Sequence, residues 1–539
     1  MTPAPEITRR MLLGGAAGLA TASLAGCGGS GDAPDTASGP VTLPVNQPYA
    51  GAVPDLKGTA AGIPDGYLGY PADPAASVSA PPGAGGPVVA LLSSYAVTPT
   101  TAPANTYLAG LNTKLNAELQ LQVVPAPDYE AKLATTVSGN ELPDLLEMLP
   151  TQPQLPQLLK AVAADLTGHL SGESIKDYPN LATFAPDMWR TTIFDGRIYG
   201  LPVPRPIQSG VPFIRTDLFQ QRGLNPDPGS WEEFRELCAA FTAPKESRYA
   251  LSLPPMAYLN GALGGINEWG EVDGGLVRWQ ETEQYRQALS WAAELAKAGY
   301  LHPDAFAANA TVLGKQRLVG GQIGIHPDGY SAWGSLARFL PEGRQEVIGG
   351  LTVRGFAGAT PTYAIGAGST NFTILTKADD DRIVELLKIM NFLAAPFGSA
   401  EFLYRKYGNA GDQHTVEGDN PVLTRRGTDE ITPVTEALDY HLADGVKVAY
   451  EGSLTKITKA KYDFARQAEP GYRRSAVIGL YSETQARTGN TFGKTLTDLQ
   501  NGVITGRKTL DDLADALRTW NSGDGQKIKA EFAAARDAQ

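Results

Sequence analysis

Cysteine is nearly absent from this sequence: the chain of 539 residues has 2 cysteines and 5 histidines. Two cysteines cannot build a disulfide framework, and the scattered histidines form no metal-binding motif, so we expect no metal centre of that kind. Basic residues are outnumbered as well, with 45 Lys and Arg against 57 Asp and Glu and a net charge of −12. A chain this acidic, without a basic stripe, binds phosphate backbones poorly, which argues against nucleic acid as a partner.

Long apolar runs are also missing, and the most apolar stretch, residues 11–25, is shorter than the ~20 residues of a membrane helix. It follows Arg9 and Arg10 and ends in LAGC (24–27), an order typical of a secretory signal. The ending resembles the box of bacterial lipoprotein signals, and the paired arginines resemble a Tat signal, although Sec signals also carry such pairs. The resemblance implies a signal peptide over 1–26 and a lipid on Cys27. The exported protein is then anchored to the outer face of the cell membrane through the lipid only.

Residues 27–86 are rich in Gly, Pro and Ala, a composition typical of a tether. The segment also carries Tyr49, Tyr67 and Tyr70, so we expect part of it to pack on the body of the protein. After signal cleavage Cys238 is the remaining thiol, and it falls on the apolar stripe of a helix predicted over 231–241. A buried, unreactive side chain is the expected role of that cysteine.

From residue 87 onward short apolar runs alternate with helical periods, which predicts βαβ units and an α/β fold with parallel strands. Strands are predicted over 88–92, 121–124, 144–149, 211–215, 322–326 and 372–376. Helices are predicted over 105–119, 128–137, 216–222, 231–241, 282–298, 380–393, 398–407, 510–522 and 525–537. No repeat of fixed period is present, which excludes solenoids and propellers.

The segment IYGLP (198–202), followed by FIRTDLF (213–219), resembles the bacterial extracellular solute-binding proteins of family 1, the lipoprotein sugar receptors of ABC importers. Three further segments follow in the family's order, GYLHPDA (299–305), GQIGIHPDGYSAW (321–333) and KIMNFLAAPFG (388–398). Together they are similar to the long subgroup that includes alginate-oligosaccharide receptors. The resemblance implies a periplasmic-binding-protein-like fold, with two α/β lobes, a hinge and an interlobe cleft.

The same resemblance implies a division of the chain, with lobe crossings near 202–211, 325–330 and 371–373. The expected parts are the signal 1–26, the tether and N-terminal extension 27–86, the first lobe 87–204, the second lobe 205–325, a first-lobe return 326–371, and a second-lobe return with C-terminal helices 372–539. Members of the subgroup often carry a calcium loop where this chain has TAPKESRY (242–249). Calcium takes about six to eight oxygens, and one Glu cannot supply them, so we expect no metal and no cofactor.

A sugar receptor needs aromatic platforms and side chains that make paired hydrogen bonds, placed on loops at the sheet ends that face the cleft. Loops in such positions are 93–95, 150–152, 327–333 and 369–371, with a further candidate run at 259–269. The expected ligand-binding residues are Tyr95, Glu147, Arg205, Trp269, Asp328, Tyr330, Trp333 and Asn371. Core packing is the alternative for the tryptophans and Tyr330, turn or cap hydrogen bonds for Tyr95, Asp328 and Asn371, and a surface ion pair for Arg205.

The expected function is capture of an oligosaccharide and its delivery to an ABC permease, by a monomer and without chemistry. No catalytic residue is expected: GNTFGKT (489–495) lacks P-loop spacing, and the separation of possible carboxylate pairs is not readable from sequence. Three alternatives stay open, namely a lipoprotein hydrolase or lyase acting on glycans, an oligopeptide receptor, and a structural surface lipoprotein. The sequence does not specify the sugar, its length or charge, the export route, the permease, or how residues 40–86 pack.

Overall fold

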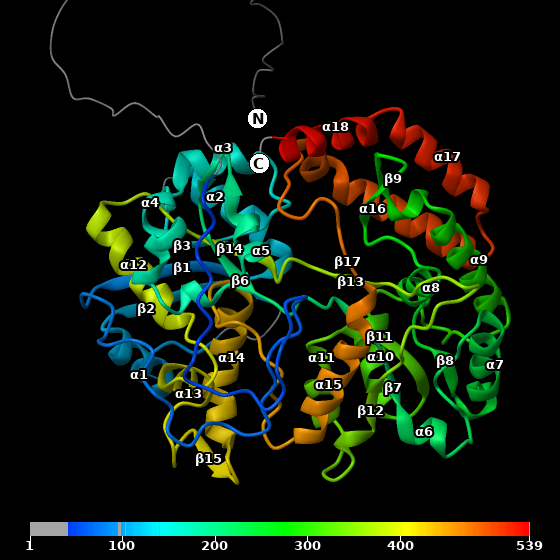
Figure 1. Ribbon diagram of the computed structural model, residues 1–539, viewed down its shortest axis with the longest axis horizontal. Coiled ribbons are helices and arrows are strands. Elements are labelled where there is room, and N and C mark those ends of the chain that lie inside the picture. Colours follow the sequence, from blue (N-terminus) through cyan, green and yellow to red (C-terminus); the bar gives the residue numbers. More distant parts are fainter. Residues whose placement is uncertain (1–40, 95–98, 103, 140, 538–539) are drawn as a thin grey trace, which may run out of the picture. The chain divides into compact units, whose positions relative to one another are not determined.

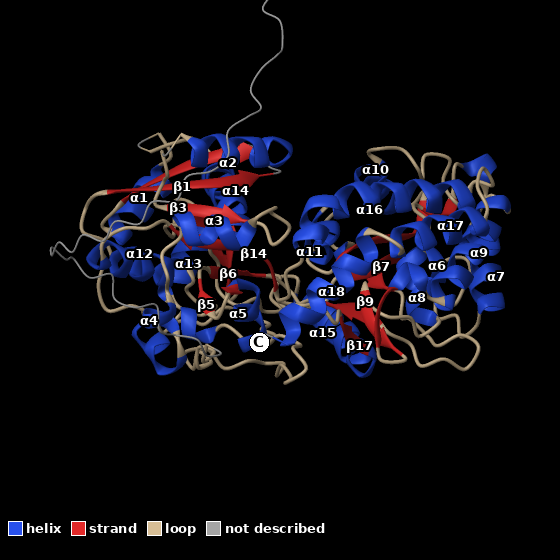
Figure 2. Cartoon of the chain, turned by 90° about the horizontal axis from the view of Figure 1, so that it is seen from above, coloured by secondary structure: helices blue, strands red, loops and turns tan. Residues whose placement is uncertain are grey.

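The computed structural model describes residues 41–94, 99–102, 104–139 and 141–537, so Cys27 and Tyr95 lie outside the described residues. Two regions, each with its own sheet, make up the described chain (Figures 1 and 2). The first lobe has a five-stranded sheet in the order β2-β1-β3-β14-β6. Its strands are β1 (Pro87–Ser94), β2 (Glu118–Pro125), β3 (Leu145–Met148), β6 (Leu201–Pro204) and β14 (Ser369–Leu375).

Strand β1 runs parallel to β2 and β3, as predicted, whereas β14 runs antiparallel to β3 and β6. Alternate side chains of β1 enter separate cores, since Ala90 and Leu92 belong to one hydrophobic cluster and Leu91 to another. Helices therefore cover both faces of this sheet. They are α1 (Thr106–Leu115), α2 (Tyr129–Ser138), α3 (Leu155–Val162), α12 (Asp380–Leu393), α13 (Ala400–Tyr407) and α14 (Arg425–His441).

The second lobe has a four-stranded sheet in the order β12-β7-β11-β8, in which β11 is parallel to β8 and antiparallel to β7. The strands are β7 (Gly210–Arg215), β8 (Tyr249–Leu251), β11 (Ile323–Gly329) and β12 (Ile348–Gly350). Its main helices are α7 (Trp231–Phe241), α8 (Met256–Ala262), α9 (Glu283–Lys297), α10 (Ala310–Val319), α11 (Ala332–Arg338), α15 (Thr455–Ala468), α16 (Glu483–Ile504), α17 (Leu510–Asn521) and α18 (Asp524–Asp537). No helix in the described part of the chain is long and apolar enough to cross a membrane.

The predicted lobe boundaries after residue 325 are wrong. Strand β11 stays paired with β7 as far as Gly329, and the chain then adds α11 and β12 to the same lobe. The return to the first lobe comes between β13 (Tyr363–Ile365) and β14. The chain stays there through α14 and enters the second lobe again before α15. Pairing between distant strands, which local patterns do not encode, decides this order.

Part of the N-terminal extension packs on the body, as predicted. The Val45 amide of the extension donates to the Gly172 carbonyl of the first lobe at 3.0 Å. The Tyr67 ring of the extension lies 4.3 Å from the Phe397 ring of the same lobe. Between these attachments Ile63 is buried in the main hydrophobic cluster of the second lobe. The hydroxyl of Tyr462 on α15 donates to the Lys57 carbonyl at 2.6 Å. The segment therefore contacts both lobes.

Candidate functional site

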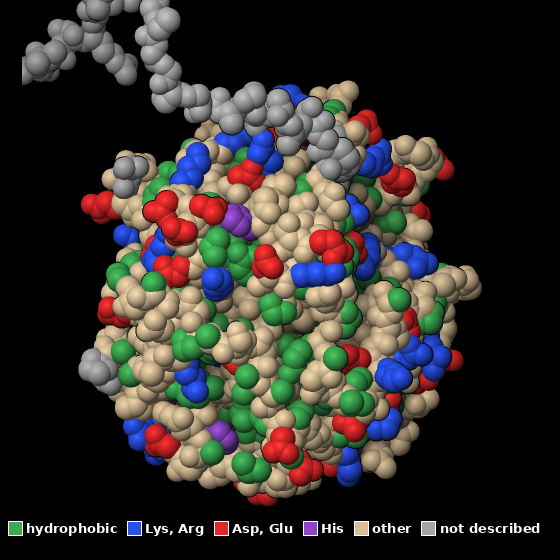
Figure 3. Space-filling model, turned by 60° about the vertical axis from the view of Figure 1, so that its left-hand side comes forward, with side chains coloured by type: hydrophobic (Ala, Val, Ile, Leu, Met, Phe, Trp, Pro, Cys, Tyr) green, Lys and Arg blue, Asp and Glu red, His purple; other side chains and the backbone are tan. Residues whose placement is uncertain are grey.

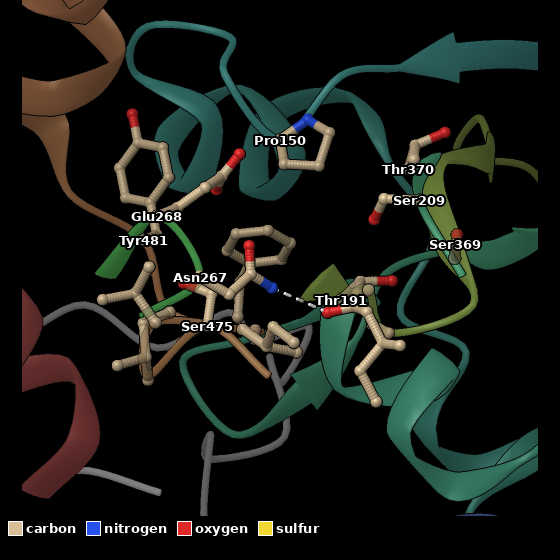
Figure 4. Close-up of a pocket in the computed structure, with 17 residues that line it drawn as sticks. Pro150, Thr191, Ser209, Asn267, Glu268, Ser369, Thr370, Ser475 and Tyr481 are labelled. Atoms are coloured by element: carbon tan, nitrogen blue, oxygen red, sulfur yellow. Dashed lines mark hydrogen bonds between the residues drawn. The ribbon is translucent and has the colours of Figure 1, made fainter. Parts of the chain in front are cut away.

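A hollow of about 370 Å³ lies where the lobes meet, and we call it the cleft (Figure 4). The first lobe contributes Pro150 after β3 and Ser369 and Thr370 at the start of β14. Loops at the carboxyl ends of parallel strands, as at Pro150, are where α/β proteins bind ligands. The other lining residues are Thr191, Phe194, Ser209, Asn267, Glu268, Ile365, Gly366, Ala367, Ser475, Val477, Ile478, Gly479, Leu480 and Tyr481.

Asn267 and Glu268 reach the cleft from the loop between α8 and β9 (Trp269–Val272). The loop turns at Gly264, which has a φ of +71°, a conformation that glycine adopts without strain. The Asn267 side-chain amide donates to the Ile365 and Arg473 carbonyls, each at 3.0 Å, and the first of these bonds is drawn in Figure 4. These bonds fix the loop, and Glu268 remains an exposed carboxylate beside it.

Tyr481 joins the two lobes at the edge of the cleft. Its ring meets that of Phe194 edge-on at 6.2 Å, and its hydroxyl lies 2.7 Å from a Glu483 carboxylate oxygen and 3.2 Å from the Gln152 carbonyl. Burial and the Glu483 carboxylate raise the pKa of Tyr481 above its usual range. The phenol therefore stays protonated, and the ring offers an apolar face with a polar tip.

The hydroxyl oxygen of Ser475 is buried in the cleft wall and has no hydrogen-bond partner among the described residues. A buried polar atom without a partner costs free energy unless a ligand or a water satisfies it. Thr191, Ser209 and Thr370 add further hydroxyl groups to the lining. The cleft thus combines several neutral hydrogen-bonding groups with the rings of Phe194 and Tyr481.

Glu147 and Asn371, both predicted to bind ligand, are instead buried in the first lobe. Glu147 is 1% exposed and accepts bonds from the Ser93 amide at 2.7 Å and the Asn371 side chain at 2.8 Å. The His441 ring lies 2.8 Å from the same carboxylate. Because their polar atoms are occupied within the protein, the two side chains support the strand ends and do not line the cleft.

Arg205, also predicted to bind ligand, lies with its guanidinium 4.2 Å from the Tyr440 ring centroid. Burial lowers the pKa of Arg205. Asp328 forms an ion pair with Lys315 at 2.8 Å. Neither side chain is part of the cleft lining.

The three aromatic residues predicted as sugar platforms are core residues, so the prediction is wrong for this structure. Trp333 is 1% exposed and donates to the Ile348 carbonyl at 3.2 Å. Trp269 is 4% exposed and packs edge-on against Phe532. Tyr330 packs against Trp333, and its hydroxyl donates to the Lys461 carbonyl. None of the three rings lines the cleft.

Several of the loops predicted to face the cleft line it, whereas the predicted ligand-binding residues that the structure describes do not. Pro150, Ser369 and Thr370 come from two of those loops, and Asn267 and Glu268 from the run at 259–269. Ser475 and Tyr481 were missed. The sequence does contain a signal for Tyr481, because this aromatic residue directly precedes Ser482. Ser482 caps α16 by accepting a hydrogen bond from the Gln485 amide.

A larger hollow of about 760 Å³ lies between α14 of the first lobe and α15 of the second, and it is lined by Tyr440, Tyr330 and several charged side chains. Its charges are paired with one another: Lys406 lies 2.9 Å from Asp444, and Arg338 lies 2.8 Å from Glu451. Paired charges are already satisfied and leave little for a ligand to bind. The cleft, with its unpaired hydroxyl, is therefore the better candidate.

Catalytic chemistry finds little support in the cleft. Glu268 is the one acidic side chain among its described lining residues, whereas glycoside hydrolysis requires a pair of carboxylates. The described residues contain no group of three or more His, Cys, Asp or Glu placed to hold a metal ion. In the segment 242–249, for which no calcium is expected, Arg248 donates to the Phe241 carbonyl at 2.8 Å.

Known proteins resemble this chain over most of its length. Lipoprotein LipO of Bacillus subtilis is 20% identical over 448 residues, 79% of this chain and 87% of that protein. The polygalacturonan/rhamnogalacturonan-binding protein YtcQ of the same organism is 22% identical over 446 residues, 77% of this chain and 85% of that protein.

Solved structures share the fold. An HMO-binding solute-binding protein associated with an ABC transporter of Bifidobacterium longum infantis superposes with a TM-score of 0.64 at 14% identity, covering 84% of this chain and 98% of that one. The alginate-binding protein AlgQ2 without calcium gives 0.62 at 14% identity, covering 85% and 99%. The model of the family described as bacterial extracellular solute-binding protein matches residues 107–409. The chain therefore belongs to the bacterial extracellular solute-binding proteins, which bind solutes and are not enzymes.

Proposed function

We propose that this protein is the substrate-binding component of an ABC importer, which captures an oligosaccharide in the cleft and delivers it to a membrane permease. The observation that carries this proposal is the lining of the cleft by both lobes, with hydroxyl, amide and aromatic groups side by side. Sugars present hydroxyls and weakly apolar C–H faces, which such a lining matches. The names of the relatives, among them binders of polygalacturonan, HMO and alginate, support a carbohydrate ligand.

Lobe closure follows from the same arrangement. A ligand that touches Asn267 in the second lobe and Thr370 in the first stabilises the conformation in which both are within reach. It shifts the population only by its differential affinity for that conformation. A permease that recognises the closed form would then distinguish loaded from empty receptor.

Isothermal titration calorimetry of the full chain in detergent against a panel of mono- and oligosaccharides tests the proposal. We expect at least one oligosaccharide to bind, and Tyr481→Ala to weaken it by about 10-fold or more, since burying an aromatic side chain contributes ~1.5–3 kcal/mol. Tyr440→Ala, which changes the larger hollow, is the matched control and should leave affinity unchanged. Binding of oligopeptides without any saccharide binding would contradict the proposal.

We further propose that the protein is exported and anchored by a lipid on Cys27. Support comes from the LAGC box at 24–27 and from the relative named lipoprotein LipO. The thiol is the group that accepts the lipid, so Cys27→Ala should release the protein from the membrane fraction or leave the signal uncleaved. A variant of normal mature size that stays in the membrane fraction would contradict the anchor.

A further inference from the structure

The cleft lining carries negative charge, whereas an acidic saccharide needs positively charged groups to bind its carboxylates. Among the described lining residues no Lys or Arg occurs, and Glu268 is the one charged side chain. It is exposed, at the end of a loop fixed by the amide of Asn267. The remaining polar lining consists of neutral groups, such as the hydroxyl of Ser475, which has no partner among the described residues.

The cations near the cleft do not line it. Arg474 forms an ion pair with Asp187 at 2.8 Å, and Arg190 lies 3.6 Å from the same residue. Arg278 lines a neighbouring hollow together with Glu268, with its guanidinium 5.8 Å from the ring centroid of Trp269. Its charge interacts with Glu268, and its buried Nη1 has no hydrogen-bond partner among the described residues. On the face of the molecule shown in Figure 3, Lys and Arg side chains lie among Asp and Glu and form no continuous basic area.

A uronate carboxylate that enters this cleft loses its water without gaining a charged donor. Carboxylates in proteins are bound by Arg, Lys or several amide groups, which form the strong charge-assisted hydrogen bonds. Burial of an ion without such partners is costly, and Glu268 adds like-charge repulsion. A neutral sugar instead donates its hydroxyls to Glu268 and meets the Ser475 hydroxyl at no charge penalty.

We propose that the cleft selects neutral oligosaccharides against uronate-containing ones, and that Glu268 is the residue that sets this preference. This inference rests on the proposed function and narrows its ligand class. It separates this chain from the relative whose name specifies polygalacturonan, a polymer of uronic acid.

The test is calorimetric titration of the full chain in detergent with tetrasaccharides of glucose, mannose and galactose and with tetrasaccharides of the matching uronic acids. We expect a neutral tetrasaccharide to bind at least about 10-fold more tightly than its uronate counterpart, a difference of ~1.4 kcal/mol. Glu268→Gln keeps the size and an acceptor oxygen but removes the charge. It should narrow that ratio by about 3-fold or more, mainly by strengthening uronate binding.

Glu271→Gln is the matched control, because Glu271 stands on β9, which directly follows Glu268, lies outside the cleft lining and pairs with Arg536. It should leave the ratio unchanged. Tighter binding of uronates by the unaltered chain, or a ratio unmoved by Glu268→Gln, overturns the inference while the proposed function stands. Failure of every saccharide, neutral and acidic, to bind overturns the proposed function as well.

Discussion

The two lobes provide contrasting examples of buried side chains. The first lobe buries charge: Arg405 is fully buried, 2.8 Å from Asp439 and 3.2 Å from Asp444. The second lobe buries aromatic rings: Trp333 packs edge-on against Phe213 at 5.3 Å and against Phe464 at 5.6 Å. Charged and aromatic side chains are the types expected at a sugar site, yet Arg405 and Trp333 serve as core. Residue type alone therefore does not separate a binding residue from a core residue.

Removal of the buried Arg405 guanidinium should cause the largest loss of stability. Burial alone would raise the pKa of Asp444, but the cations around it hold that pKa well below its usual range, so the carboxylate stays ionised. Arg405→Ala leaves Asp439 and Asp444 short of a partner in the interior. We expect a loss of about 5 kcal/mol in the free energy of unfolding, the upper end of the range for breaking a buried pair.

The measurement is urea denaturation followed by circular dichroism. Arg425→Ala is the matched control, because Arg425 is 96% exposed and its pair with Asp429 spans 3.9 Å. A surface pair of this kind contributes little, so the control should change stability by less than about 0.5 kcal/mol. Equal effects of the two substitutions would show that the buried Arg405 pair contributes no more to stability than a surface pair.

Loss of the Trp333 ring from the core should cause the second-largest loss of stability. Trp333→Ala removes a side chain packed on three aromatic neighbours, Phe213, Tyr330 and Phe464. We expect a loss of about 4 kcal/mol, typical of truncating a large buried ring, measured by the same denaturation. A variant of unchanged stability but weaker ligand binding would return Trp333 to the site and contradict its position in the core.

Local signals explain which elements were predictable. The helices predicted over 231–241 and 380–393 have the bounds of α7 and α12, because Ser230 and Asp379 cap them through the amides of Glu233 and Arg382. Helix α14 was missed, since Pro433 lies inside it and proline in a helix interior is a breaker signal. Helix α16 of the second lobe was missed as well.

The site was predictable only to the level of loops. The positions of loops follow from strand ends, which apolar runs reveal. Whether a side chain such as Trp269 faces the cleft or a core depends on which helices pack over it, here α17 and α18 through Trp520 and Phe532. These contacts join residues some 250 positions apart, and no local pattern encodes them.

Acid should weaken the second lobe through a buried histidine. His326 is fully buried, with its Nδ1 2.7 Å from the Ser252 hydroxyl and its Nε2 4.0 Å from Asp328. Burial, with the Lys315 charge, lowers the pKa of His326 from 6.5 to about 4, although Asp328 opposes the shift. The folded protein holds the ring neutral while the unfolded chain takes up a proton. The stability from the neutral ring is therefore complete above pH 6.5 and is lost as the pH falls towards 4.

The size of this effect is about 3 kcal/mol between pH 8 and pH 4. His326→Gln should flatten that part of the pH profile of the unfolding free energy. An acid response of His326→Gln equal to that of the unaltered chain would assign the response to other groups.

The smallest effect is expected where the N-terminal extension touches the second lobe. Tyr462→Phe removes the hydroxyl that donates to the Lys57 carbonyl and keeps the ring, so stability should fall by only about 1 kcal/mol. Hydrogen exchange gives the sharper measurement. Amides such as that of Leu56, which donates to the Gly66 carbonyl at 3.0 Å, should exchange faster, while that of Val45, held by the first lobe, should not change. Unchanged exchange at Leu56 would mean that burial of Ile63 alone holds the segment against the second lobe.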